Sequence, residues 1–167
     1  MSFTIRPLRT GEAALYRDIR LEALRTHPDA LAAPYEHEAA QPLGFFAGRL
    51  RDSTVFGGFR GLALLGVAGF MVRSGVRRAH IGTLWGMYVR AEARGTGLSR
   101  LLVEAVLDHA RDHVEVVRLT VTANNTVAHR LYAAAGFEPY GVERHALKVD
   151  GRYLDEVLMV NWLTRNA

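Results

Sequence analysis

The chain has 167 residues, 49% of them hydrophobic, and a net charge of +4 that comes almost entirely from arginine, because Lys148 is the only lysine. This length suits one ordinary domain with a buried core, so we expect a single domain over residues 1–167. The absence of cysteine excludes disulfides, thiolate metal sites and a cysteine nucleophile, and arginines spread along the whole sequence argue against a nucleic-acid partner.

The N-terminal region is predicted to form a strand and then a helix. Residues 3–8 have a strand-like pattern without a signal-peptide core, and no segment approaches the roughly 18 to 20 apolar residues that span a bilayer. We therefore expect a cytoplasmic protein with no membrane partner. Thr10 is the expected N-cap of a helix that ends near Thr26. Its apolar side is expected to contain Ala14, Leu15, Ile19, Leu21 and Leu24.

Prolines interrupt the chain after this helix. Pro28, Pro34 and Pro42 separate short pieces, and residues 43–51 are predicted to form a second helix. A polar cluster lies between the prolines. We interpret it as a solvated loop, with the border of a ligand pocket as the alternative. Its members are Glu36, His37 and Glu38.

The remaining sequence alternates strands and helices without a repeat or a linker. Asp150-Gly151 favours a type I′ hairpin, in which both central residues need positive φ, and Gly136 is a typical helix end. An antiparallel run precedes one strand–helix–strand crossover, which predicts a mixed sheet. The predicted strands are 54–60, 62–73, 79–89, 116–122, 138–149 and 152–162, and the predicted helices are 97–112 and 126–135.

The segment RAEARGTGLSRLL, residues 90–102, places two glycines where a strand gives way to a helix. A helix N-terminus has unpaired N–H groups, and glycine lets the backbone approach an anion, so the loop suits a phosphate or pyrophosphate. It is not a P-loop, which needs a lysine before Ser or Thr. It is not a dinucleotide fingerprint either, because Arg100 occupies the third glycine position. A tight turn without a ligand remains the alternative on this segment alone.

A second segment, NTVAHRLYAAAGF at residues 125–137, gives the loop a family context. Together the two segments resemble the GNAT superfamily of N-acetyltransferases. The family's acetyl-CoA loop, Q/R-x-x-G-x-G/A, is matched at Arg94 and Gly97, whereas Ser99 replaces the last glycine or alanine. The resemblance covers about residues 62–162. The family pattern N-x-x-A-x-x-L-Y-x-x-x-G-F is matched at Asn125, Ala128, Leu131, Tyr132, Gly136 and Phe137.

The resemblance implies an α/β fold with a mixed, mostly antiparallel central sheet of about seven strands, splayed at strands 4 and 5 and flanked by about four helices. It implies an acetyl-CoA-dependent N-acetyltransferase, without a metal, that acts on a primary amine by direct attack in a ternary complex. A small-molecule acceptor is the main expectation. Acetylation of a protein N-terminus or lysine, and a non-catalytic CoA-binding module, are the alternatives. The resemblance also suggests a homodimer through the C-terminal strands.

The resemblance further assigns roles in donor binding. Backbone groups of Met87 and Val89 are expected to pair with pantetheine amides, and a backbone N–H near Met87 or Tyr88 to stabilise an oxyanion. Asn125 is expected to contact the pantetheine or phosphate arm, and Tyr132 to reach the thioester sulfur and protonate the leaving thiolate. The pyrophosphate is expected at the backbone N–H groups of Arg94, Gly95, Thr96, Gly97, Leu98 and Ser99.

The general base is the unassigned role. Many family members carry a glutamate on the strand before the loop, but the positions of the same parity as Met87 are Thr83 and Ile81, and neither is a base. Trp85 is expected to lie opposite in parity to Tyr88. An acceptor that arrives partly as free amine needs no base at all. The candidate substitutes are His80, Glu156 and, through water, Glu22.

A histidine pair on the predicted helix 97–112 has a spacing that could bind a metal. His109 and His113 are four residues apart, but the zinc-protease pattern needs a glutamate after the first histidine, and Ala110 is there. Histidine is favourable near a helix C-terminus in its own right, so we expect no metal.

Overall fold

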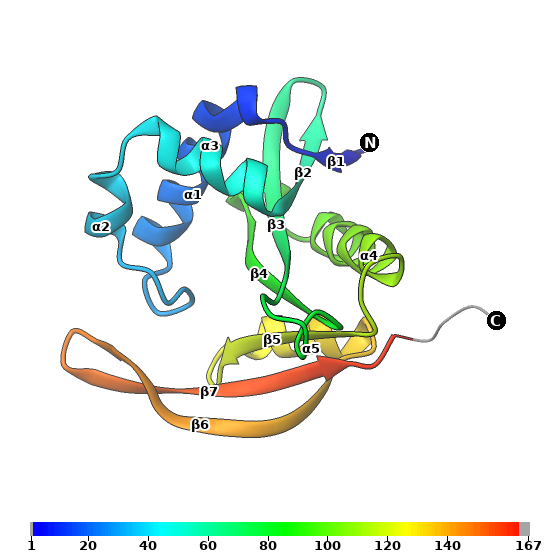
Figure 1. The fold of residues 1–167 in the computed structure, drawn as a ribbon. Coiled ribbons are helices and arrows are strands. Elements are labelled where there is room, and N and C mark those ends of the chain that lie inside the picture. Colours follow the sequence, from blue (N-terminus) through cyan, green and yellow to red (C-terminus); the bar gives the residue numbers. More distant parts are fainter. Residues whose placement is uncertain (1, 164–167) are drawn as a thin grey trace.

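The computed structural model describes residues 2–163, which form a seven-stranded sheet with helices on both faces (Figure 1). The strand order is β1-β2-β3-β4-β5-β7-β6, and β4–β5 is the parallel pair in an otherwise antiparallel sheet, as predicted. The strands are β1 Thr4–Pro7, β2 Thr54–Arg60, β3 Ala63–Val72, β4 Ile81–Val89, β5 Val116–Thr122, β6 Glu138–Val149 and β7 Arg152–Asn161. The helices are α1 Ala13–Thr26, α2 Tyr35–Ala39, α3 Leu43–Asp52, α4 Leu98–Arg111 and α5 Thr126–Ala134, with short 3-10 turns η1 Thr10–Glu12 and η2 Ala91–Ala93.

Two hydrophobic clusters hold the helices against opposite faces of the sheet. Helix α4 buries Leu98, Leu102, Val106 and Ala110, whose four-residue spacing places them on one side of the helix. These residues pack against β3, β4 and β5 in the larger cluster. Helices α1 and α3 cover the other face, where they pack on β2 and β3. Among the described helices, none is long and apolar enough to cross a bilayer.

The buried side of α1 differs from the predicted one. Leu15 is 42% exposed and Ala14 is also exposed, so the expected apolar side is wrong at these positions. A 3-10 turn precedes the helix, and Tyr16 and Arg20 occupy buried positions on the true inner side. The apolar pattern predicted the wrong side because Arg20 occupies a buried position, which a rule based on hydrophobicity assigns to apolar residues such as Leu15.

The polar cluster after α1 is a helix with a buried acid, not a solvated loop. Glu38 on α2 is 1% exposed and lies between two guanidinium groups. Its Oε1 atom accepts from Arg20 Nε at 3.0 Å and from Arg49 Nη1 at 2.8 Å, and its Oε2 atom accepts from both Nη2 atoms at 3.0 and 3.1 Å. This cluster joins α1, α2 and α3, and it fixes the segment between α1 and α2 over the sheet.

An irregularity in β4 reverses the side-chain alternation of that strand. The register passes from Val67↔Tyr88 to Gly69↔Trp85, so β4 has one more residue than β3 in this interval. Gly86 lies there with φ of +63°, a conformation that favours glycine. Trp85 and Tyr88 therefore both face α1, and Met87 faces α4. The predicted parity of β4, in which Met87 shares a side with Thr83 and Trp85 lies opposite Tyr88, is wrong for this reason.

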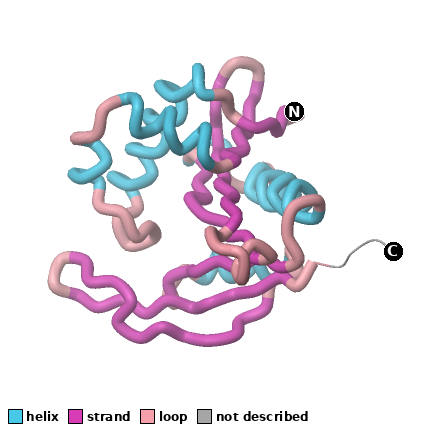
Figure 2. The backbone as a smooth tube through the Cα atoms, viewed as in Figure 1, coloured by secondary structure: helices cyan, strands magenta, loops and turns pink. Residues whose placement is uncertain are grey.

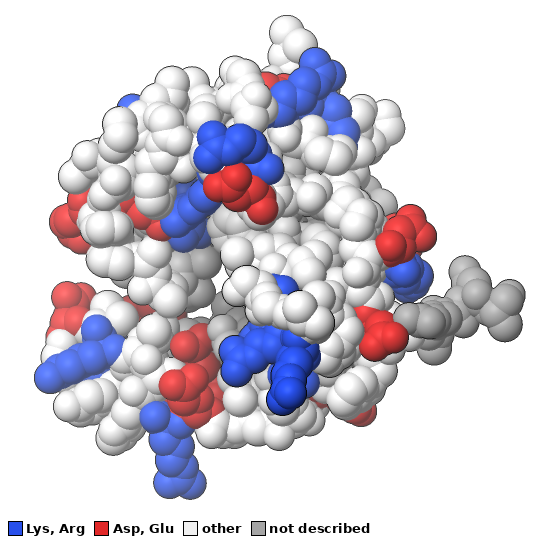
Figure 3. Space-filling view, viewed as in Figure 1, with Lys and Arg blue, Asp and Glu red and all other residues white. Residues whose placement is uncertain are grey.

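The C-terminal hairpin reaches back to the segment that follows α1. Its turn residues, Asp150 and Gly151, have φ of +50° and +77°, as the predicted type I′ turn requires. Figure 2 shows the loop between α1 and α2 facing the hairpin tip, and Arg152 Nη2 lies 3.1 Å from Asp29 Oδ2 across this gap. On the face drawn in Figure 3, acidic and basic residues are interspersed over the hairpin and the lobe above it.

An ion pair near the N-terminus predicts a pH dependence of stability. Arg6 Nη2 lies 2.7 Å from Glu12 Oε1, and the hydrogen bond to Arg6 lowers the pKa of Glu12 from 4.5 to about 2. A lowered pKa in the folded state gives stabilisation that is complete above pH 4.5 and is lost as the pH falls toward about 2. We expect Glu12→Gln to flatten the fall of the melting temperature over this interval.

Thermal denaturation of both proteins across this acidic range measures the effect. Glu104→Gln, which removes an exposed partner of Arg100 on α4, is the control and should leave the slope unchanged. Equal slopes for the parent and Glu12→Gln would contradict the assignment.

Candidate active site

Strands β4 and β5 separate after a short parallel contact. Their pairing covers only Ile81↔Val116, Gly82↔Val117 and Thr83↔Arg118, whereas β4 stays paired with β3 as far as Val89. Residues 84–89 therefore have an edge toward β5 without a strand partner among the described residues. A cavity of about 400 Å³ opens at this splay between β4, α5 and the loop before α4. We call it the donor cavity.

The N-terminus of α4 presents a row of free amides beside the donor cavity. Gly95 and Gly97 have φ of +72° and +87°, and Gly97 is the N-cap without a capping side chain. The first backbone bond into the helix runs from the Leu101 N–H to the Gly97 carbonyl. Within residues 2–163, the N–H groups of 95–100 have no backbone acceptor. Such a turn, followed by the positive end of a helix dipole, is chemically suited to a phosphate or diphosphate.

Two predicted donor-binding side chains also have partners inside the protein. Arg94 donates from Nε to the Val89 carbonyl at 3.3 Å, and its Nη2 atom lies 3.0 Å from His27 Nε2. Asn125 accepts from the Ala128 N–H at 3.1 Å and so caps α5. Both residues line the donor cavity, as do Met87, Tyr88, Val89, Ser99 and Tyr132.

Tyr132 lies at the inner side of the donor cavity. Its side chain is 6% exposed and packs edge-on against Phe137, with ring centroids 5.8 Å apart. Burial raises the pKa of its phenol. The hydroxyl therefore stays protonated at neutral pH and is available as a donor.

Tyr88 uses its hydroxyl differently. It donates to Glu22 Oε2 at 2.7 Å, and Arg90 Nε lies 3.4 Å from the same oxygen. Burial and the hydrogen bond to Glu22 raise the pKa of Tyr88. A carboxylate that is held by a phenol and a guanidinium is poorly suited to accept a proton from a substrate.

A second cavity, of about 520 Å³, lies between the sheet and α1 with the segment that follows it, residues 30–33. We call it the acceptor cavity. It shares Trp85, Gly86 and Thr120 with the donor cavity, so the two meet at the irregularity in β4. Five ionisable basic and acidic side chains line it. They are Arg20, Arg73, Arg118, Glu143 and Glu156.

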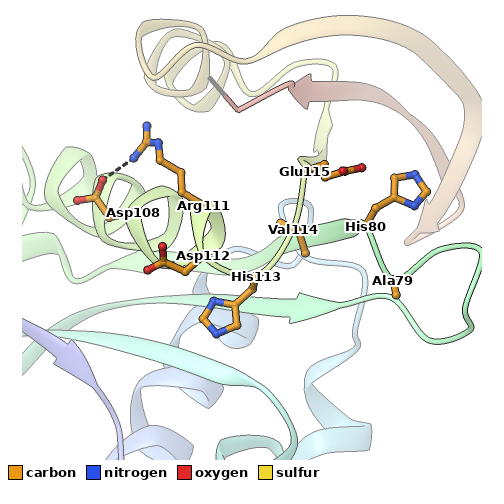
Figure 4. Close-up of a pocket in the computed structure, with 8 residues that line it drawn as sticks. All are labelled: Ala79, His80, Asp108, Arg111, Asp112, His113, Val114 and Glu115. Carbon is orange, nitrogen blue, oxygen red and sulfur yellow. Dashed lines mark hydrogen bonds and ion pairs between the residues drawn. The ribbon is translucent and has the colours of Figure 1, made fainter. Parts of the chain in front are cut away.

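The three candidate bases lie in different places. Glu156 lines the acceptor cavity, and Glu22 lies beneath Tyr88. His80 precedes β4 at the end of the strand away from Met87, where it lines a separate cavity of about 810 Å³ with His113 and Glu115 (Figure 4). His80 is therefore too far from the splay to act on a substrate there.

No group of three or more potential metal ligands occurs within the described part of the chain. His109 and His113 stack on each other with centroids 4.2 Å apart, and His113 Nδ1 lies 2.8 Å from the His109 carbonyl oxygen. Burial lowers the pKa of His109, whose ring packs against Phe56 and Phe70. The pair is part of the packing of α4.

The sequence reasoning missed several residues that line these cavities. Gly86 carried a usable signal, since an isolated glycine within a strand pattern often marks a bulge. His27 and Leu31, which lie in the irregular segment after α1, carried no signal in the linear sequence. Their position depends on the buried Glu38 cluster, which no local pattern reveals.

Comparison with known proteins agrees with this geometry. The sequence model described as the Acetyltransferase (GNAT) family matches residues 12–137, which is most of the chain. The chain belongs to the GNAT acetyltransferase family. It is thus an acyltransferase that uses acetyl-CoA as co-substrate, as the two sequence segments predicted.

Solved GNAT structures share the fold of the whole chain. A GNAT family acetyltransferase from Streptococcus pneumoniae is 21% identical, with a TM-score of 0.86, and the alignment covers 97% of this chain and all of the other. yncA from Salmonella typhimurium, with its cofactor acetyl-CoA, is 23% identical, with a TM-score of 0.82 and coverages of 100% and 97%. A ribosomal-protein-alanine N-acetyltransferase from Brucella melitensis is 25% identical, with a TM-score of 0.79 and coverages of 96% and 99%. None of the curated proteins compared with the chain matches it significantly.

Proposed function

We propose that residues 1–167 act as one domain that acetylates the primary amine of a small molecule, by direct attack on acetyl-CoA in a ternary complex. The observation that carries the proposal is the meeting of two cavities at the β4 irregularity, one beside the free amides of α4 and the other beneath α1 and the segment that follows it. A donor and an acceptor can enter from the two cavities and meet at this junction. Such a layout suits direct transfer and requires no acyl-enzyme.

The free amides at the start of α4 support the donor assignment. They are the natural site of the diphosphate, with Ser99 adding a hydroxyl. The unpaired edge of β4 at Met87, Tyr88 and Val89 suits the pantetheine amides, which would extend the sheet as a short strand. Asn125 and Tyr132 complete the opposite wall. The diphosphate site consists of the free amides of Gly95, Thr96, Gly97, Leu98 and Ser99. The N–H of Arg94, which was also expected there, instead donates to the Ala91 carbonyl at 3.2 Å.

The reaction needs a proton acceptor and a proton donor. The amine nitrogen forms a bond to the thioester carbon, the carbon–sulfur bond breaks, and the thiolate leaves. Glu156 is the acid in the acceptor cavity that best suits removal of the amine proton, directly or through water. Tyr132, which is protonated at neutral pH, donates its proton to the departing thiolate. A backbone N–H on the open edge of β4, near Met87 or Tyr88, stabilises the oxyanion.

A small acceptor is favoured over a protein acceptor. The segment between α1 and α2 and the hairpin tip meet over the acceptor side, where Arg152 and Asp29 form an ion pair. A polypeptide needs an open groove to pass a lysine or an N-terminus to the thioester. The contact between the hairpin tip and the segment after α1 leaves less room for a polypeptide than an open cleft would.

Tyr132→Phe tests the catalytic assignment. The substitution removes one hydroxyl and keeps the ring that packs on Phe137, so we expect turnover to fall about 100-fold, in the usual range for loss of a general acid. The affinity for acetyl-CoA should change by no more than about threefold. Steady-state kinetics and calorimetry with acetyl-CoA measure the two quantities on the same preparation.

Tyr153→Phe, on the exposed hairpin, is the matched control and should leave both quantities unchanged. Unchanged turnover in Tyr132→Phe would remove the acid role from Tyr132. A parent protein that binds CoA but acetylates no amine would instead support the binding-module alternative.

A further inference from the structure

Resting on the proposed function, we propose that the acceptor is a small zwitterion: an amine that also carries a carboxylate, of amino-acid or dipeptide size. Its ammonium group is held by the Glu143 and Glu156 side of the acceptor cavity, and its carboxylate by the Arg118 and Arg73 side.

The acceptor cavity contains both signs of charge without pairing them. Within residues 2–163, the side chains of Arg73, Glu143 and Glu156 have no hydrogen bond or ion pair. Arg118 contacts the Tyr140 ring at 5.5 Å, and its Nε is buried without an acceptor. By contrast, the fifth charged residue of the cavity, Arg20, is paired with Glu38, a carboxylate that it shares with Arg49. Two cations and two anions therefore remain available to a ligand.

The strand register places the two acids directly opposite each other. Glu143 on β6 pairs with Glu156 on β7, which in turn pairs with Thr122 on β5. Like charges at opposing positions destabilise a sheet, so the fold gains nothing from this arrangement. An ammonium group between the two carboxylates would relieve the repulsion. Because Glu143 is exposed, water screens part of this repulsion, and a basic ligand at this end of the cavity would remove the rest.

The register also separates the acids from the arginines along the sheet. Arg118 on β5 pairs with Val160 on β7 and lies at the last position where β4 still pairs with β5. Glu156 on β7 pairs with Thr122, which is four residues after Arg118 on β5. Arg118 and Thr122 are therefore about 13 Å apart along the strand. Thr120 and Leu158 lie between these two pairs and line the same cavity. The arginine side chains extend into the cavity from one end and the glutamate side chains from the other, which leaves space for a short zwitterion between them.

The order of these charges also suits the chemistry. The acids lie toward the end of β5 where the splay is open and where Asn125 and Tyr132 follow in the chain, so the amine is held on the side that faces the donor cavity. The arginines lie where β4 and β5 close, away from the reacting groups. Polyamines and aminoglycosides, which carry only positive charge, would leave Arg73 and Arg118 uncompensated or repelled.

A panel of acceptors with and without a carboxylate tests the proposal. Acetyl transfer is measured with the twenty standard amino acids, β-alanine and γ-aminobutyrate, with the carboxamide of each, and with putrescine, spermidine and kanamycin. We expect turnover to concentrate on the free acids, with kcat/KM at least tenfold above that of the matching carboxamide. Arg118→Gln should reduce the preference for the free acid over the carboxamide to less than about threefold. The cause would be a higher KM for the free amino acid, and the KM for acetyl-CoA should stay unchanged.

Arg78→Gln removes the same charge from the exposed turn before β4, outside the cavity, and should keep the full preference. Calorimetry with the best amino acid and the CoA-loaded protein measures the same loss as binding. Faster turnover of carboxamides or polyamines, or an undiminished preference in Arg118→Gln, would overturn the zwitterion proposal while leaving the acetyltransferase assignment intact. Absence of turnover on the entire panel, with CoA still bound, would overturn the proposed function and this inference with it.

Discussion

Gly97→Pro is expected to reduce the affinity for acetyl-CoA at least 100-fold. Gly97 caps α4 with φ of +87°, whereas proline fixes φ near −65°. The substitution also removes one of the amides that we assign to the diphosphate, and it turns the neighbouring amides away from their common direction. Calorimetric titration of the variant with CoA measures the loss.

A second substitution at the same position separates backbone geometry from folding. Asparagine tolerates positive φ better than other side chains, and no atom lies within 4 Å of a Cβ built on Gly97. Gly97→Asn should therefore keep the affinity for CoA within about tenfold of the parent. Circular dichroism of both variants shows whether each keeps the helix content of the parent protein. Parent-like CoA affinity in a folded Gly97→Pro variant would show that the diphosphate lies elsewhere.

Glu38→Ala is expected to lower the free energy of unfolding by about 3–5 kcal/mol, the range observed when one partner of a buried ion pair is removed. Burial favours the protonated form of Glu38, but the hydrogen bonds and charges of Arg20 and Arg49 outweigh it and hold the pKa of Glu38 below its ordinary value. Alanine would leave both guanidinium groups without their four hydrogen bonds. Urea denaturation measures the change.

Glu36→Ala is the matched control, because Glu36 is an exposed glutamate on the same short helix. Its effect should stay within about 0.5 kcal/mol of zero. Equal stability of the two variants would mean that the cluster contributes no more than a surface charge. Because Arg20 and the segment after α1 line the acceptor cavity, Glu38→Ala should also raise KM for the amine more than KM for acetyl-CoA.

The parts of the fold with regular local patterns could be predicted from the sequence. The alternation in β5, the four-residue spacing in α4 and the Asp150-Gly151 turn each encode their own geometry over a few residues. Their order then predicted the mixed sheet. The glycine turn with free amides at the start of α4 could be predicted as well, because two glycines at the start of a helix have a direct physical meaning.

The missed features depend on contacts between distant residues. Glu38 reads as a solvated acid until α1 and α3 bring Arg20 and Arg49 to it. Gly86 changes the side-chain parity of β4 only because β3 pairs across it in a fixed register. The acceptor cavity combines residues from β3 to β7 with the segment after α1, so its mixture of charges exists only in the folded chain.

The short contact between β4 and β5 has a consequence for how the protein tolerates mutation. Among residues 2–163, three residue pairs of β4 and β5 join the two halves of the sheet as a ladder. With pantetheine bound along the open edge as proposed, the co-substrate joins these halves, and at 100 times its dissociation constant it would add about 2.7 kcal/mol to stability. Substitutions that weaken this junction would then have little effect on stability while acetyl-CoA is abundant. When acetyl-CoA is scarce, the same substitutions would lead to unfolding and degradation of the protein. Nutrient supply, through the concentration of this one metabolite, would set how many sequence changes the protein can accept.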